Sequence, residues 1–369
     1  MRTPVDIGAG IATVTASFNS WKEVDVTAVI SKIKIIKRPE ASSSQLLTSL
    51  KVEGTGAVHA LAYSSDGKKL AAVTQKDGTI QIWNTQSWKV ETELPSTSSE
   101  VYRCAFLEGG EVLATAHYSM KRTIDGKRVS GKVRLWDLAT GQVKATLADG
   151  RGIVRLAASP NGRLLATNEM WNAKEGREFR FATRVWDVSE QRVIATIGTK
   201  RANVEFSADS KMLATAGEAV ELWDPATGEA LGSLPNPDSP WPVPSVAFAS
   251  KGNLLAGGNA KGKVFIWDVP TRTLRATLTH GEGERLAVAF EFSPDGRTLA
   301  VATFVRLSSS TDRTPTIDFW NTATAERKAT FIAPGVVIWS LTYDPSGRIL
   351  STGGPGVVWL WNTKQFGQR

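Results

Sequence analysis

Seven short segments of the chain alternate apolar and polar residues and then end in tryptophan followed by aspartate or asparagine. They are IQIWN, VRLWD, TRVWD, VELWD, VFIWD, IDFWN and VWLWN, with tryptophans Trp83, Trp136, Trp186, Trp223, Trp267, Trp320 and Trp361. The residue two positions before the tryptophan is polar in five of the seven, between apolar or β-branched neighbours. A period of two with β-branched and aromatic residues predicts β-strands.

A second recurring pattern precedes these strands, in which two apolar runs flank a turn rich in proline, aspartate and glycine. It is clearest at 158–168, 206–216, 292–303 and 343–353. Such turns need positive φ angles, which Gly67, Gly162, Gly296 and Gly347 can adopt. A short amphipathic segment follows each Trp-Asp pair. One repeat therefore contains four predicted strands, and the tryptophans recur every 46 residues or so, about the length of a propeller blade.

The Trp-Asp strand ends and the Phe-Ser-Pro-Asp-Gly-Arg turn resemble those of the WD-repeat β-propeller family, and the turn sequences resemble those of its prokaryotic members. The similarity extends over roughly residues 44–363. It implies an all-β fold, a seven-bladed propeller of four-stranded antiparallel blades over 44–369, after an N-terminal extension and linker at 1–43. Within the chain, 45–67 aligns with 142–162, so Gln45–Leu50 is an outer strand without its own blade. The resemblance implies that this strand completes the seventh blade, whose inner strands fall in 336–362, and closes the ring.

Residues 1–40 fit no blade. The segment KIKIIK (32–37) alternates like a strand, whereas Ser20 and Glu23 have the spacing of a helix capping box. The β-branched residues between Val24 and Ile36 favour a strand. A segment that docks on the ring and a segment that binds a partner are both consistent with this sequence.

Long insertions between the second and third strands are predicted in blades two, three and six, at 117–132, 168–183 and 304–316. Insertions in repeat proteins lie on one face, which is often the binding face. The family resemblance places them with the loops that lead into each blade, on what we call the upper face. The first insertion has a net charge of +4, half of the chain's +8, while the second is neutral and interleaves aromatic residues.

Aromatic and basic residues in these solvent-facing loops are the candidate binding residues, because they have less structural reason to be there than strand residues. They are Tyr118, Lys121, Arg122, Lys127, Arg128, Trp171, Arg177, Phe179, Arg180, Trp241, Arg285 and Arg306. The predicted function is that of a non-catalytic interaction scaffold or sensor subunit, which binds a protein or peptide partner on the upper face within a multi-subunit assembly. The alternative is a nucleic-acid-binding propeller, in which the basic insertion contacts phosphates and the aromatic residues stack on bases.

Composition argues against most other classes. The single cysteine, Cys104, excludes an intrachain disulfide, and three histidines make a histidine-rich metal site improbable, so no cofactor is expected. The segment 257–264 has Val264 where a phosphate-binding loop needs serine or threonine. Serine-hydrolase and zinc-protease motifs do not occur, so neither an enzyme nor a small-molecule substrate is expected. The first twenty residues do not read as a secretory signal, and no run of about eighteen apolar residues occurs, which predicts a cytoplasmic protein with no membrane partner.

Overall fold

The computed structural model describes residues 3–6, 11–14, 45–53, 56–95, 100–123, 126–148, 150–172, 179–200, 202–239, 242–243, 245–259, 261–280, 285–305, 314–335 and 337–366. The chain divides into two units, Met1–Glu40 and Ala41–Arg369. In the first unit, β1 (Thr3–Asp6) pairs antiparallel with β2 (Ile11–Val14). The strand and capping-box predictions for 20–37 lie outside the described residues.

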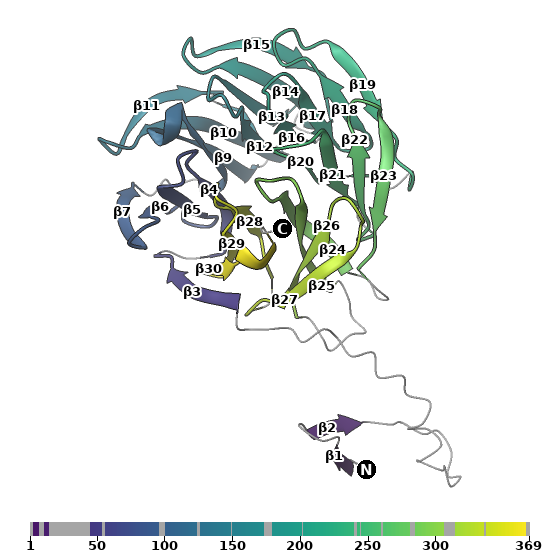
Figure 1. The fold of residues 1–369 in the computed structure, drawn as a ribbon. Helices are drawn as coiled ribbons and strands as arrows, with labels where there is room; N and C mark the ends of the chain where they lie inside the picture. Colours follow the sequence, from purple (N-terminus) through teal and green to yellow (C-terminus); the bar gives the residue numbers. More distant parts are fainter. Residues whose placement is uncertain are drawn as a thin grey trace. The chain divides into compact units, whose positions relative to one another are not determined.

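The second unit is a ring of seven four-stranded antiparallel sheets, drawn in Figure 1. Blade one holds β4 (Val58–Tyr63), β5 (Lys69–Thr74), β6 (Ile80–Asn84) and β7 (Lys89–Leu94); blade two holds β8 (Glu100–Leu107), β9 (Val112–Thr123), β10 (Gly126–Asp137) and β11 (Gln142–Leu147). Blade three holds β12 (Gly152–Ala158), β13 (Leu164–Asn172), β14 (Phe179–Asp187) and β15 (Arg192–Ile197); blade four holds β16 (Asn203–Phe206), β17 (Leu213–Ala216), β18 (Val220–Trp223) and β19 (Ala230–Leu234).

Blade five holds β20 (Ser245–Phe248), β21 (Leu254–Gly258), β22 (Val264–Asp268) and β23 (Thr273–Leu278); blade six holds β24 (Arg285–Phe292), β25 (Thr298–Val305), β26 (Thr316–Asn321) and β27 (Arg327–Ile332). Blade seven holds β28 (Ser340–Tyr343), β29 (Ile349–Gly354), β30 (Val357–Asn362) and, from the start of the unit, β3 (Leu46–Lys51). In that blade Leu50 lies opposite Val358, so the first and last strands of the ring share one sheet. The all-β, seven-bladed prediction is confirmed.

The tryptophans that end the third strands pack between blades, as their apolar neighbours require. Trp267 and Trp361 are fully buried, and Trp83 and Trp136 are nearly so. In blades two, three, four and seven the indole Nε1 donates to a threonine of the second strand at 2.8–2.9 Å: Trp136 to Thr115, Trp186 to Thr167, Trp223 to Thr215 and Trp361 to Thr352. These bonds satisfy a donor that burial would otherwise leave unpaired.

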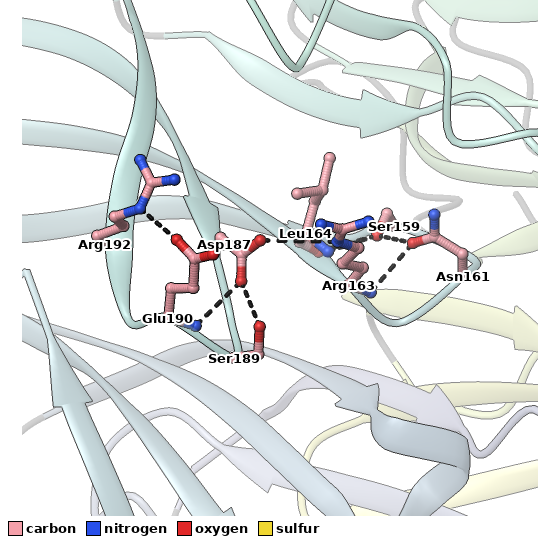
Figure 2. A network of polar contacts seen from close by, with 8 residues as sticks. All are labelled: Ser159, Asn161, Arg163, Leu164, Asp187, Ser189, Glu190 and Arg192. Atoms are coloured by element: carbon pink, nitrogen blue, oxygen red, sulfur yellow. Dashed lines mark hydrogen bonds and ion pairs between the residues drawn. The ribbon is translucent and has the colours of Figure 1, made fainter.

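The polar residues of the repeat fix its turns, as Figure 2 shows for blade three. The Ser159 hydroxyl donates to Oδ1 of Asn161 at 2.7 Å and accepts from the backbone N–H of Leu164 at 2.8 Å. Asp187, which follows Trp186, accepts from the Ser189 hydroxyl and pairs with Arg163 at 3.6 Å. The aspartates and asparagines of the repeat therefore hold hairpins, in agreement with the turn chemistry predicted for them.

The first strands of the blades surround a central channel. A cavity of about 570 Å³ occupies its end beside the turns between the first and second strands. Five residues at one equivalent position of their strands line it: Ala62, Ala105, Ala157, Glu205 and Thr342. Because alternate residues of a strand face the same side, this set identifies the channel-facing positions of the inner strands.

Candidate functional site

An exposed tryptophan lies at the upper end of the channel, where blade seven meets blade one. Trp339 immediately precedes β28 and is 43% exposed, far more than the buried tryptophans of the strand ends. Its ring stacks on that of His59 in β4, with ring centroids 4.6 Å apart and an interplanar angle of 22°. A large aromatic side chain held in place yet open to solvent is a common anchor for a binding partner.

The aromatic contacts continue into blade two. Tyr102 meets His59 edge-on at 5.9 Å, and Tyr118 meets Tyr102 edge-on at 5.5 Å. The Tyr102 hydroxyl accepts from Nε2 of Gln75 in blade one at 2.9 Å and donates to Glu100 of its own strand, so the ring is held by residues of blades one and two. We call Trp339, His59, Tyr102 and Tyr118 the aromatic rim.

Electrostatics keep the rim uncharged at neutral pH. Burial, followed by the nearby Arg103 guanidinium, lowers the pKa of His59 to about 4, so the imidazole stacks in its neutral form. Burial, followed by the hydrogen bond to Glu100, raises the pKa of Tyr102 to about 12. The rim therefore offers apolar and hydrogen-bonding surface rather than charge.

Blade three extends this surface through a small apolar cluster. Val154 and Met170 are buried there, and Tyr118 and Phe181 pack against them. Tyr118 therefore belongs both to the rim and to this cluster. The ring contacts thus run from blade seven through blade one to blade two, and Tyr118 links them to the cluster of blade three.

Trp171, predicted as an open contact residue, is half-buried in β13. The Arg151 guanidinium lies over its ring, 4.5 Å from the centroid. Glu169, fully buried, holds this arginine at 3.3 Å and Arg184 at 3.1 Å. The two guanidiniums stabilise a carboxylate whose pKa burial would otherwise raise further. Trp171 therefore lies beneath a positioned cation.

The basic insertion of blade two is strand for most of its length rather than an irregular loop. β9 and β10 pair continuously up to Thr123 and Gly126, which extends the blade as a hairpin. In this register Lys121 lies opposite Arg128, and Arg122 opposite Lys127. Four basic residues thus share the end of one hairpin.

The other predicted site residues are placed in part. Phe179 and Arg180 begin β14 opposite Asn172 and Trp171, and Phe179 is 38% exposed. Arg285 begins β24 opposite Val305. Arg177, Trp241 and Arg306 lie outside the described residues. The structure thus brings Tyr118 into the rim, and Trp171, Phe179 and Arg180 onto the neighbouring hairpin.

The predicted site residues include Tyr118 but not Trp339, His59 and Tyr102, because these three lie at or just before the start of inner strands and not in the long insertions. Alignment of those strands gives the missing signal. Four inner strands carry an irregularity in their pairing at one equivalent position, which is occupied by His59, Tyr102, Val154 and Val288. Trp339 occupies the same position before β28. When the repeats are aligned, His59, Tyr102 and Trp339 occupy one equivalent position, which identifies most of the aromatic rim from the sequence.

Within the described ranges, no three histidine, cysteine, aspartate or glutamate side chains gather closely enough to hold a metal ion. No helix in the described part of the chain has the length and apolar character needed to cross a bilayer.

Comparison with known proteins gives partial matches. A family model described as "WD domain, G-beta repeat" matches residues 44–84, 228–268 and 326–362. Telomerase protein component 1 of Rattus norvegicus is 25% identical over 332 residues, which cover 89% of this chain and 10% of that protein. Protein transport protein SEC31 of Chaetomium globosum is 30% identical over 168 residues, or 43% of this chain and 12% of that protein. Apoptotic protease-activating factor 1 of Rattus norvegicus is 26% identical over 160 residues, or 42% and 12%. The chain thus matches about a tenth of the length of each of these relatives.

Proposed function

Because the chain belongs to the WD-repeat β-propeller family, we propose that it is a non-catalytic interaction module whose upper face binds a protein or peptide segment within a larger assembly. The relatives support this class of function, since their names describe a telomerase component, a transport protein and a protease-activating factor. The chain matches only a small part of each, so the partner is a matter for experiment. Fold alone does not define function, which must come from the site.

The aromatic rim carries the proposal. A tryptophan that is 43% exposed and stacked on a fixed neighbour presents a large, preorganised apolar surface. Little conformational entropy is lost when a partner covers it, since the ring is already held in place. Aromatic residues of this kind contribute a large share of the binding energy at protein interfaces.

The test is affinity purification of the tagged protein from its native cells, followed by mass spectrometry, with wild type, Trp339→Ala and Leu274→Ala compared. Leu274 is 37% exposed on the outer strand β23, so its variant removes apolar surface away from the rim. We expect Trp339→Ala to lose the main partners and Leu274→Ala to keep them. Equal retention by both variants would refute binding through the rim.

One observation favours nucleic acid as a second candidate. The hairpin of blade two places two facing pairs of basic residues at its end, which suits a phosphate backbone. If this hairpin binds nucleic acid, affinity should fall steeply between about 50 and 200 mM salt. Reversing the charge of Lys121, Arg122, Lys127 and Arg128 together should then abolish retention on RNA or DNA. Unchanged retention would eliminate this candidate.

A further inference from the structure

The channel cavity has an apolar side and a polar margin. Each first strand contributes one residue at the same position, two residues before the turn to the second strand opens. Around the ring these residues are Ala62, Ala105, Ala157, Glu205, Ala247, Glu291 and Thr342. The alanines of blades one, two and three line one side of the cavity, and Glu205 and Thr342 line it from the two blades that flank these three.

The carboxyl group of Glu205 enters this cavity without a protein partner. Val204 and Phe206, its neighbours in β16, are buried in the apolar core shared with blade three, so the alternation of the strand turns Glu205 to the channel side. No hydrogen bond or ion pair joins its carboxyl group to another side chain or backbone group of the described ranges. A carboxyl group that is partly withdrawn from water and has no partner favours a ligand that supplies hydrogen-bond donors.

Blade six adds a second carboxyl group beside the cavity. Glu291 is equivalent in position to Glu205 and accepts from Oγ1 of Thr342, which lines the cavity, and from the backbone N–H of Tyr343, both at 3.3 Å. Burial raises the pKa of Glu205 and of Glu291 to about 8, and the charge of Glu205 contributes to the rise at Glu291. A cation bound to both groups would stabilise their ionised forms.

No positive charge of the described residues competes for these carboxyl groups inside the cavity. Its described lining includes no lysine or arginine. Burial raises the pKa of Cys104 to about 12 and that of Tyr63 above its usual range, so both are neutral at physiological pH. Arg103, which precedes Cys104, donates instead to the backbone carbonyls of His59 and Tyr102 at the rim.

We propose that the cavity binds a small organic cation, a primary aliphatic ammonium, whose N–H groups donate to Glu205 and Thr342 while its hydrocarbon chain lies against the alanines. The volume of about 570 Å³ is typical of small-molecule sites and far larger than a bare ion needs. An ammonium group has three donors, which suit an unpartnered carboxyl group and a hydroxyl oxygen. The cavity adjoins the turns where the first strands end, whereas the rim lies where they begin, so this ligand is separate from the partner of the proposed function.

The first experiment follows the wild-type protein by NMR. Alanine methyl groups are labelled with carbon-13, and the protein is titrated at pH 8 with n-butylammonium chloride at constant ionic strength. We expect saturable shifts of the Ala62, Ala105 and Ala157 signals, assigned with single Ala→Gly variants, while the signal of Ala145 on the outer strand β11 stays in place. A titration in which no alanine methyl signal of the wild type shifts saturably would overturn the site without reliance on any variant.

The second experiment tests recognition of the charge. 1-Butanol matches butylammonium in size and shape but is neutral. We expect butylammonium to bind the wild type about tenfold more tightly, because its hydrogen bonds to a carboxylate are charge-assisted. Equal affinity for the two probes would refute a cation site.

The third experiment assigns the carboxyl group. Glu205→Gln keeps the shape of the side chain and should weaken butylammonium binding about tenfold, whereas Glu221→Gln, exposed on β18 of the same blade, should bind like wild type. Equal losses in both variants, or none in a folded Glu205→Gln protein, would overturn the role of Glu205. If Glu205→Gln does not fold, the comparison of the two probes on the wild type decides the proposal. Trp339→Ala should leave the affinity for butylammonium unchanged, so this site and the rim can fail separately.

Discussion

The hydrogen-bond pattern inside the blades predicts a stabilising substitution, Val301→Thr. In blade seven, Trp361 lies opposite Leu350, and Thr352, two residues further along β29, accepts from its indole N–H at 2.9 Å. In blade six, Trp320 lies opposite Leu299, so Val301 occupies the place of the threonine. Nε1 of Trp320 has no partner among the described residues, and nor does Nε2 of the neighbouring His280.

The expected gain in the free energy of unfolding comes from giving the Trp320 indole N–H an acceptor. A buried N–H without a partner costs about 1–3 kcal/mol, and threonine is nearly the same shape as valine. Exchanging a buried methyl group for a hydroxyl loses about 0.8 kcal/mol of apolar burial, as Val301 is fully buried. The free energy of unfolding should therefore rise by about 1 kcal/mol, which for a domain of this size raises the melting temperature by about 2 °C.

The assay is chemical denaturation of wild type and Val301→Thr, with Thr352→Val as the mirror variant. Thr352→Val removes the acceptor of a buried indole N–H, so the free energy of unfolding should fall by about 1–3 kcal/mol. Opposite signs for the two variants support the reasoning. A loss of stability in Val301→Thr as large as that in Thr352→Val would refute it.

Three further predictions concern the ring and its charges. Deletion of residues 1–50 removes most of β3 from blade seven and should collapse the fold, because β30 loses its outer partner and becomes an exposed edge strand; an unchanged thermal midpoint would contradict this. Since the folded-state pKa values of Glu205 and Glu291 lie above their unfolded values, stability should decrease as pH rises from about 5 to 8, by up to about 1.4 kcal/mol per pH unit for each group. Glu205→Gln should reduce the slope of the free energy of unfolding against pH, measured by denaturation between pH 5 and 8. The same slope in wild type and variant would contradict this role of Glu205. Glu169→Ala leaves Arg151 and Arg184 without their buried carboxylate and should lower the free energy of unfolding, measured by chemical denaturation, by about 2 kcal/mol. An unchanged free energy of unfolding would show that these ion pairs do not stabilise the fold.

The fold could be predicted from the sequence because its determinants are local and repeated. Each blade carries its own alternating third strand and its own hairpin turn, so seven copies reinforce one another. The threonines that accept from Trp136, Trp186, Trp223 and Trp361 are equally regular, since the register places them two residues past the tryptophan's partner. Such features need no knowledge of long-range packing.

The site was predicted less completely, because it depends on contacts between blades. Trp339 and His59 are far apart in the chain and stack only after the ring closes. The length and charge of the blade-two insertion predict a basic site, whereas its paired halves contribute only Tyr118 to the aromatic rim.

The most direct test of partner binding through the aromatic rim is photo-crosslinking from position 339. A photoreactive phenylalanine analogue is placed there or, as the control, at position 274 on the outer strand β23, and adducts formed in native cells are compared. Binding through the rim predicts a defined partner adduct from position 339 and none from position 274. The same adduct from both positions, or an adduct from position 274 alone, would contradict it.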